Sequence, residues 1–291
     1  MNPTLLLTAL APLVWGSTYL LTTSYLSNLS PMLLATLRVL PAGLLLMLLV
    51  RTWPPREWWL KIGVLALLKQ SLFFALLYAS ALRLPGGVAA TIGASTPAIV
   101  MLLALPLLGQ KPTARGLALA AVSLVGVGLI SLNGGARLDG LGLLAALGFA
   151  FVNALGSVLL KRWGWPQGAT PLHQTAWELT LAGLFLLPFS LGGLEALGQV
   201  SALGWAALAF LTVVSTALAA LVWQRGLNLL PVQQVSLLSP LSPLTAVILD
   251  LVVLHRALTP SQLLGAALVI GSVVVNALPE KATPPTAAQA S

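Results

Sequence analysis

Residues 84–113 read LPGGVAATIGASTPAIVMLLALPLLGQKPT, and their pattern returns 146 residues later, over residues 230–259. Each copy places a proline, Pro97 or Pro243, inside an apolar run long enough to cross a membrane. Helices interrupted at matching places in two halves are typical of transporters, because rigid pieces hinge there and freed carbonyls line a cavity. We therefore expect hinges at Pro97 and Pro243. The coinciding pairs are Leu84/Leu230, Pro85/Pro231, Pro97/Pro243, Leu103/Leu249, Leu105/Leu251, Leu108/Leu254 and Thr113/Thr259.

The composition indicates an integral membrane protein. Of the 291 residues, 58% are hydrophobic and only 7% are charged, whereas about a quarter of the residues in soluble domains are charged. The chain divides into ten apolar segments of about 20 residues, the length that a helix needs to cross a hydrocarbon core about 30 Å thick. The segments are 5–23, 31–50, 59–82, 87–108, 114–132, 140–160, 170–191, 203–226, 231–253 and 259–278.

This segment count predicts an all-α integral membrane fold of ten transmembrane helices in two inverted five-helix repeats. An odd number of spans in each repeat makes the second half enter the membrane from the opposite side. We expect the repeats at residues 1–137 and 138–279, followed by a disordered tail at 280–291. A weaker match supports the division, because Ala-Gly-Leu at 42–44 returns at 182–184, an offset of 140 residues.

The basic residues predict the orientation in the membrane. The formal net charge is +8, but Lys and Arg are scattered through short loops, so we expect a lipid bilayer and no nucleic acid as partner. With the N-terminus inside, three basic loop residues lie outside: Arg83, Arg137 and Arg256. Nine lie on the cytoplasmic side: Arg51, Arg56, Lys61, Lys111, Arg115, Lys161, Arg162, Arg225 and Lys281. Both termini are therefore predicted to be cytoplasmic.

Missing motifs narrow the class of function. The chain has no cysteine, no GxxxxGK[ST] nucleotide-binding loop, no GxSxG nucleophile motif and no His/Asp/Glu cluster with metal-ligand spacing. We therefore expect no catalytic residue, no metal and no cofactor, and we favour a carrier of a small molecule over an enzyme or a scaffold. Transport then runs down the substrate gradient or is coupled to an ion, and Glu178 or Asp250 could carry a proton.

Three motifs resemble a known family. They are WGSTYL at 15–20, LRVLPAG at 37–43, and LLYASALRLPGGVAATIGASTPAIVMLLA at 76–104. With the five-plus-five layout, they resemble the EamA family of the drug/metabolite transporter (DMT) superfamily. The resemblance implies a multi-pass protein of the bacterial inner membrane that exports aromatic and other neutral amino acids by alternating access. Relatives also move organic anions, phosphorylated sugars or drugs, which is the alternative. Residues 148–162 lack the Trp-Gly of the first helix, so no role transfers there.

Three charged residues lie near the middle of predicted spans. Arg38, Lys69 and Glu178 each cost about 2.5–3.5 kcal/mol to insert, so each requires a reason. A zwitterionic amino acid presents a carboxylate and an ammonium, which Arg38 or Lys69 and Glu178 could pair. The alternative is a structural ion pair of Arg38 with Glu178 that holds the repeats together and leaves Lys69 facing the cavity.

Aromatic residues complete the predicted substrate site. Trp15 and Tyr19 are four residues apart and share a helix face at mid-depth, and Tyr78 continues a stripe on the third segment. Such rings stack on an aromatic substrate or hold an ammonium, although packing is the commoner role. The predicted substrate-binding residues are Trp15, Tyr19, Arg38, Lys69, Tyr78, Trp177 and Glu178. The oligomeric state, monomer or homodimer, stays open.

Overall fold

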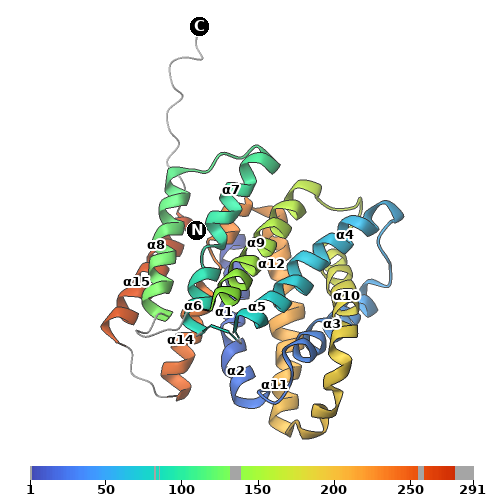
Figure 1. Cartoon of the computed structure of the whole chain (residues 1–291). Helices are drawn as coiled ribbons and strands as arrows, with labels where there is room; N and C mark the ends of the chain where they lie inside the picture. Colours follow the sequence, from blue (N-terminus) through green and yellow to red (C-terminus); the bar gives the residue numbers. More distant parts are fainter. Residues whose placement is uncertain (1, 82, 85, 132–138, 255–258, 279–291) are drawn as a thin grey trace.

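The computed structural model describes residues 2–81, 83–84, 86–131, 139–254 and 259–278. The predicted tail at 280–291 and the loop residues Arg137 and Arg256 lie outside this part of the chain, as do the side chains of Tyr19 and Asp250. Every regular element in the described residues is a helix, which confirms the all-α prediction. Figure 1 shows the helices packed side by side in one bundle.

The first half of the chain forms helices that match the first five predicted segments. Several spans consist of consecutive helical pieces, including one π-helical turn, η2. The pieces are α1 (Pro3–Trp15), α2 (Ser17–Tyr25), α3 (Pro31–Val50), η1 (Arg56–Trp58), α4 (Trp59–Ala66), η2 (Leu67–Leu72), α5 (Phe73–Ala81), α6 (Gly86–Gly93), α7 (Thr96–Leu108) and α8 (Ala114–Ser131).

In the described residues of the second half, every regular element is again a helix, with one π-helical turn, η4. Its pieces are α9 (Gly140–Trp163), α10 (Pro171–Ser190), η3 (Leu191–Gln199), α11 (Ala202–Thr212), η4 (Val213–Leu218), α12 (Ala219–Leu229), α13 (Val232–Ser236), α14 (Leu241–Leu254) and α15 (Pro260–Ala277). Within the described residues, nine helical stretches are long and apolar enough to cross a membrane, and they fall on nine of the predicted segments. The predicted segment 114–132 falls on the shorter apolar helix Ala114–Ile130.

Four spanning helices begin in the same way. α1, α3, α10 and α15 each start at a proline that follows a polar residue, respectively Asn2, Ser30, Thr170 and Thr259. Proline suits the first helical position because the N–H that it lacks would have no partner within the helix, and the preceding side chain caps the next free N–H groups. The sequence therefore fixes where these spans begin.

Both predicted interruptions are present, each a few residues before its proline. α6 ends at Gly93 and α7 begins at Thr96, directly before Pro97; α13 ends at Ser236 and α14 begins two residues before Pro243. Each helix restarts so that the proline lies in its first turn, where no backbone N–H is required. A hydroxyl serves the carbonyl that Pro97 leaves without an N–H partner: the Thr96 Oγ1 donates to Gly93 O at 2.7 Å.

The centre of the bundle is a close crossing of α3 and α10. A Cβ added at Gly43 would lie 2.4 Å from Thr180 N, and one added at Gly183 would lie 2.5 Å from Leu40 Cα. The two contacts are reciprocal, because Leu40 and Gly43 occupy the positions of Thr180 and Gly183 at the 140-residue offset. Reciprocal contacts of this kind are what a two-fold axis between two helices produces. The pairing 43 with 180 and 40 with 183 also means that α3 and α10 run in opposite directions.

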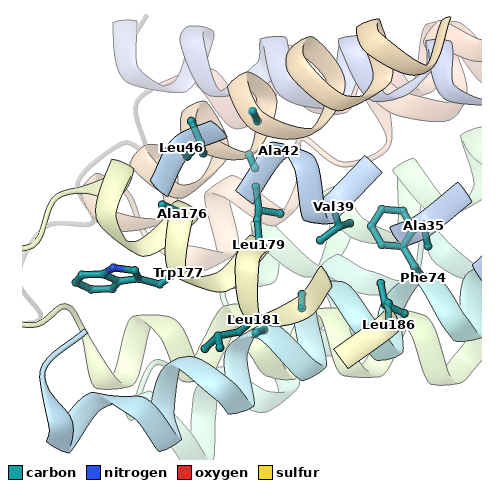
Figure 2. Packing of buried hydrophobic residues seen from close by; sticks show 14 of the residues in the cluster. Ala35, Val39, Ala42, Leu46, Phe74, Ala176, Trp177, Leu179, Leu181 and Leu186 are labelled. Carbon is teal, nitrogen blue, oxygen red and sulfur yellow. The ribbon is translucent and has the colours of Figure 1, made fainter. Parts of the chain in front are cut away.

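Apolar side chains fill the space around this crossing. Figure 2 shows Val39 and Ala42 of α3 (blue) facing Leu179 of α10 (yellow), with Phe74 of α5 at the other end of the cluster beside Ala35. The α3, α10 and α5 residues in this cluster are buried. The core therefore packs α3 and α10 against α5, which continues from the π-turn η2 that carries Lys69.

A second close pair, α8 with α15, lies at one edge of the bundle (Figure 1, left). A Cβ at Gly126 would lie 2.9 Å from Gly265 O, and a Cβ at Gly265 would lie 2.5 Å from Gly126 O. The Ser123 and Ser272 hydroxyls are 2.6 Å apart across the same contact. The glycines thus allow close packing between these two helices, as small residues do at contacts between membrane helices.

Candidate substrate site

Lys69 and Glu178 form the centre of a buried polar network. The Lys69 Nζ lies 2.9 Å from Glu178 Oε2 and 2.7 Å from Gln224 Oε1. Gln224 Nε2 donates to the same carboxylate oxygen at 2.9 Å, and Gln174 Nε2 donates to Glu178 Oε1 at 2.6 Å. The exposed fractions are 7% for Lys69, 1% for Glu178, 3% for Gln224 and 0% for Gln174. The carboxylate is therefore held by one cation and two amides, as a buried charge requires.

The structure corrects the ion pair considered from the sequence. Glu178 pairs with Lys69, not with Arg38, so the Lys69 ammonium has an anionic partner. The reason is the α3–α10 crossing: the helices are antiparallel, Arg38 precedes the crossing on α3, and Glu178 precedes it on α10. The two charges consequently lie on opposite sides of the crossing. The sequence alone gives no sign of this crossing geometry.

Arg38 lies on the other side of the crossing and has only neutral partners. Its Nε donates to Thr216 Oγ1 at 3.3 Å and its Nη2 donates to Ser215 Oγ at 3.4 Å. The guanidinium carbon stands 5.2 Å from the centre of the Phe74 ring, a cation–π contact. Arg38 is 3% exposed and contacts no carboxylate among the described side chains. Among the described residues it is thus a buried cation without a compensating anion.

Two π-helical turns hold these charges. η2 spans Leu67–Leu72 and η4 spans Val213–Leu218, so the turns correspond at the same 146-residue offset as the interrupted helices. η2 carries Lys69, which binds Glu178 of the second half; η4 carries Ser215 and Thr216, which bind Arg38 of the first half. Single π-turns inside α-helices are frequent at functional sites. Each turn therefore contacts the buried charge of the opposite half.

Trp15 joins the second π-turn. Its indole Nε1 donates to the Ser215 carbonyl at 2.9 Å, and its ring lies 5.2 Å from the ring of Trp223. Thr18 Oγ1 lies 3.5 Å from Ser215 Oγ. The WGST motif thus places the Trp15 indole and the Thr18 hydroxyl against Ser215, which binds Arg38. Gly16 allows the close approach to α14, because a Cβ there would lie 2.6 Å from Ser242 O.

Tyr78 and Trp177 have different surroundings. The Tyr78 ring stacks on Phe74 with centroids 5.9 Å apart, so it belongs to the Arg38 side of the crossing. Trp177 is packed in the α3–α10 core, where its indole Nε1 donates to Thr52 O at 2.6 Å. The structure therefore brings Trp15, Arg38 and Tyr78 to one side, and it gives Trp177 a packing contact instead.

Four residues of the site were missed from the sequence: Gln174, Ser215, Thr216 and Gln224. A signal for Ser215 existed, because it stands opposite Lys69 at the 146-residue offset. The amides Gln174 and Gln224 lie on the same helices as predicted residues but look like ordinary polar positions. Only the folded network shows that both donate to Glu178.

A cavity of ≈ 700 Å³ lies apart from the charged network, where the ends of α1, α7, α8, α13 and α15 meet. Lys111 and Arg115 line it together with Gln233 and Gln234 of the short helix α13. Arg115 Nη2 donates to the carbonyls of Val275 and Leu278. This cavity opens at the end of the bundle that the basic residues predict to be cytoplasmic, next to one of the interrupted helices.

The bundle of apolar spanning helices, two of them interrupted, and the charges buried between them define a multi-pass membrane transport protein. The chain belongs to the EamA-like transporter family, whose model matches residues 2–132 and 140–278. It is 36% identical to Protein PecM of Dickeya dadantii over 91% of this chain and 89% of that protein. It is also 29% identical to the uncharacterized transporter YvbV of Bacillus subtilis, over 93% and 90% respectively.

A solved structure described as "Crystal structure of protein" shares the fold. Its TM-score is 0.78, with 18% identity over 95% of this chain and 99% of that one. At this identity the match supports the architecture alone. The family and its transport class therefore rest on the family model and the related sequences.

Proposed function

We propose that this protein is a secondary transporter that exports amino acids, aromatic and other neutral ones, across the bacterial inner membrane by alternating access. The observation that carries the proposal is the pair of buried charge sites, Arg38 on one side of the α3–α10 crossing and Lys69 with Glu178 on the other. Charged groups inside a membrane are costly and mark substrate or ion pathways by default. These groups also link the two halves, which is where an alternating-access carrier binds its substrate.

The two halves, residues 1–137 and 138–279, are proposed to be inverted repeats. The reciprocal contacts of Gly43 and Gly183 support a two-fold axis between α3 and α10. The matching π-turns and the matching interruptions before Pro97 and Pro243 support the same relation. We propose that the halves rock about the interruptions at Pro97 and Pro243.

Aromatic rings beside Arg38 support an amino acid as the substrate. Phe74 and Tyr78 stand on one side of this residue, and Trp15 with Trp223 stand beside Ser215. Ring faces of this kind suit an aromatic side chain and attract an ammonium. The motifs that indicate the family also resemble those of the bacterial aromatic amino acid exporter YddG.

A second candidate is an organic anion or a phosphorylated compound. It is favoured by the charge balance of the buried site: the described side chains there include two cations, Arg38 and Lys69, and one carboxylate, that of Glu178. An anionic substrate would neutralise the excess cation. The two candidates differ in whether an ammonium on the substrate is required.

A flux screen in proteoliposomes tests the function. Liposomes that contain the purified protein are preloaded with unlabelled compound, and the entry of labelled L-phenylalanine, L-leucine and glucose 6-phosphate is followed in separate samples. The proposal expects protein-dependent, saturable entry of the amino acids. Entry of the sugar phosphate alone would establish the second candidate and exclude the first. Repeating the experiment with a pH gradient shows whether a proton is coupled to the flux.

A further inference from the structure

Arg38 retains hydrogen-bond capacity that the described residues do not use. A guanidinium has five N–H donors in a planar fork. Arg38 uses Nε and Nη2 on the hydroxyls of η4, at 3.3 and 3.4 Å, whereas Nη1 makes no hydrogen bond with any described residue. Both existing bonds are longer than the 2.7–2.9 Å usual between a charged donor and a carboxylate. The guanidinium is therefore held in place by weak acceptors and lacks a strong one.

The Tyr78 hydroxyl lacks a partner in the same region. Its oxygen is buried and has no hydrogen-bond partner among the described residues. The Tyr78 ring stacks on Phe74 at an interplanar angle of 19°, and Phe74 lies beneath the Arg38 guanidinium. The hydroxyl-bearing ring and the guanidinium both contact the ring of Phe74, so the two polar groups lie in one region of the bundle. A buried hydroxyl left without an acceptor costs about 1–3 kcal/mol, so its position calls for an explanation.

One acceptor placed between the two groups would satisfy both unused donors, Arg38 Nη1 and the Tyr78 hydroxyl. A carboxylate has two oxygens that accept hydrogen bonds, and it carries the negative charge that a buried arginine lacks here. A hydroxyl or carbonyl ligand would satisfy the geometry but leave the charge of Arg38 uncompensated. A phosphate would bring close to two negative charges to a single guanidinium, since Lys69 is already bound to Glu178.

We propose that Arg38 and Tyr78 form the binding site for the carboxylate of the transported molecule, and that Ser215 and Thr216 hold the guanidinium in place while the site is empty. Lys69 and Glu178 then serve as a link between the halves and do not bind the substrate carboxylate. This assignment rests on the proposed function only in taking the ligand to be the transported molecule. The sequence predicts that Arg38, Lys69 and Glu178 together bind the substrate. Here Arg38 binds the substrate carboxylate, whereas Lys69 and Glu178 link the two halves.

Binding of three related probes to the purified full-length protein in detergent tests this assignment. L-Phenylalanine carries both charged groups, phenylpyruvate lacks the ammonium, and phenethylamine lacks the carboxylate. Isothermal titration calorimetry gives the dissociation constant of each probe for the wild type and for the variants Tyr78→Phe and Arg38→Lys. Tyr25→Phe is the matched control, because Tyr25 lies at the exposed end of α2. Thermal unfolding of each variant shows that it is folded.

We expect wild-type protein to bind both acids, and phenethylamine at least about tenfold more weakly, because hydrogen bonds to charged groups discriminate by this order. Tyr78→Phe and Arg38→Lys should each weaken both acids about tenfold and leave phenethylamine unchanged, and Tyr25→Phe should match the wild type. If the wild type binds phenylpyruvate but not phenylalanine, the carboxylate site at Arg38 and Tyr78 is supported and amino acid export is excluded. Three results would overturn the site. The wild type could bind phenethylamine as tightly as phenylalanine, or it could bind none of the probes. The third result is that Tyr78→Phe binds both acids as tightly as the wild type.

Discussion

The Lys69 ammonium lies 2.9 Å from the Glu178 carboxylate and joins η2 of the first half to α10 of the second. Both side chains are almost completely buried, so neither charge can turn to water if its partner is removed. Removing one member of a buried ion pair is far more costly than replacing both. The pair is therefore expected to stabilise the contact between the halves only as a unit.

This coupling predicts a non-additive pair of substitutions. Lys69→Met leaves Glu178 with amide partners only and should destabilise the protein by about 3–5 kcal/mol. The double variant Lys69→Met, Glu178→Gln should lose less than the two single variants together, by at least about 1 kcal/mol. Unfolding of all four proteins in detergent measures the coupling. Additive losses would mean that the ion pair contributes nothing as a pair.

The glycines at the α3–α10 crossing give a second prediction. Gly43→Ala would place a Cβ 2.4 Å from Thr180 N, and this neighbour is backbone and cannot move aside without separating the helices. We expect a large loss of thermal stability. Gly63→Ala is the control, because no described atom lies within 4 Å of its added Cβ, and alanine is the better helix former. Equal melting temperatures for the two variants would contradict the close crossing.

A third prediction concerns the π-turn η4. Thr216→Val removes both the acceptor of Arg38 Nε and the donor to Leu211 O at 2.7 Å. Thr36→Val removes only a hydrogen bond within α3, from Thr36 Oγ1 to Met32 O. We expect Thr216→Val to lose about 1–3 kcal/mol more stability than Thr36→Val, since one of its lost bonds involves a charge. Thermal unfolding of the two variants side by side measures this difference, and a larger loss in Thr36→Val would refute the role of η4.

The orientation is testable directly because the chain has no cysteine. Gln167 and Glu195 are exposed at opposite ends of α10, before and after the helix. If both termini are cytoplasmic, a cysteine in place of Glu195 should react with a membrane-impermeant thiol reagent added to intact cells, and one in place of Gln167 should react only after lysis. The opposite labelling pattern would invert the predicted topology.

Much of the fold could be predicted from local sequence. The lengths of the apolar runs predicted the spans. The prolines at 97 and 243 indicated both interruptions, because proline lacks the backbone N–H that a helix interior needs. The pairing of charges could not be predicted, because it depends on where α3 crosses α10, and that crossing depends on the backbone contact of Gly43. The π-turns were equally hidden, since no residue type specifies them. Consequently the contacts of Arg38 with Ser215 and Thr216 became visible only in the fold.

The most direct test of the account is counterflow of labelled L-phenylalanine in proteoliposomes with wild-type protein, Arg38→Gln and Arg225→Gln. Arg225 is the control, because it is an exposed arginine of α12 outside the buried site. We predict saturable entry with the wild type and with Arg225→Gln, and entry lowered at least about tenfold with Arg38→Gln, because the substrate carboxylate loses its charged partner. Wild-type entry in a folded Arg38→Gln protein would show that transport does not depend on the buried arginine, and would contradict substrate binding at Arg38.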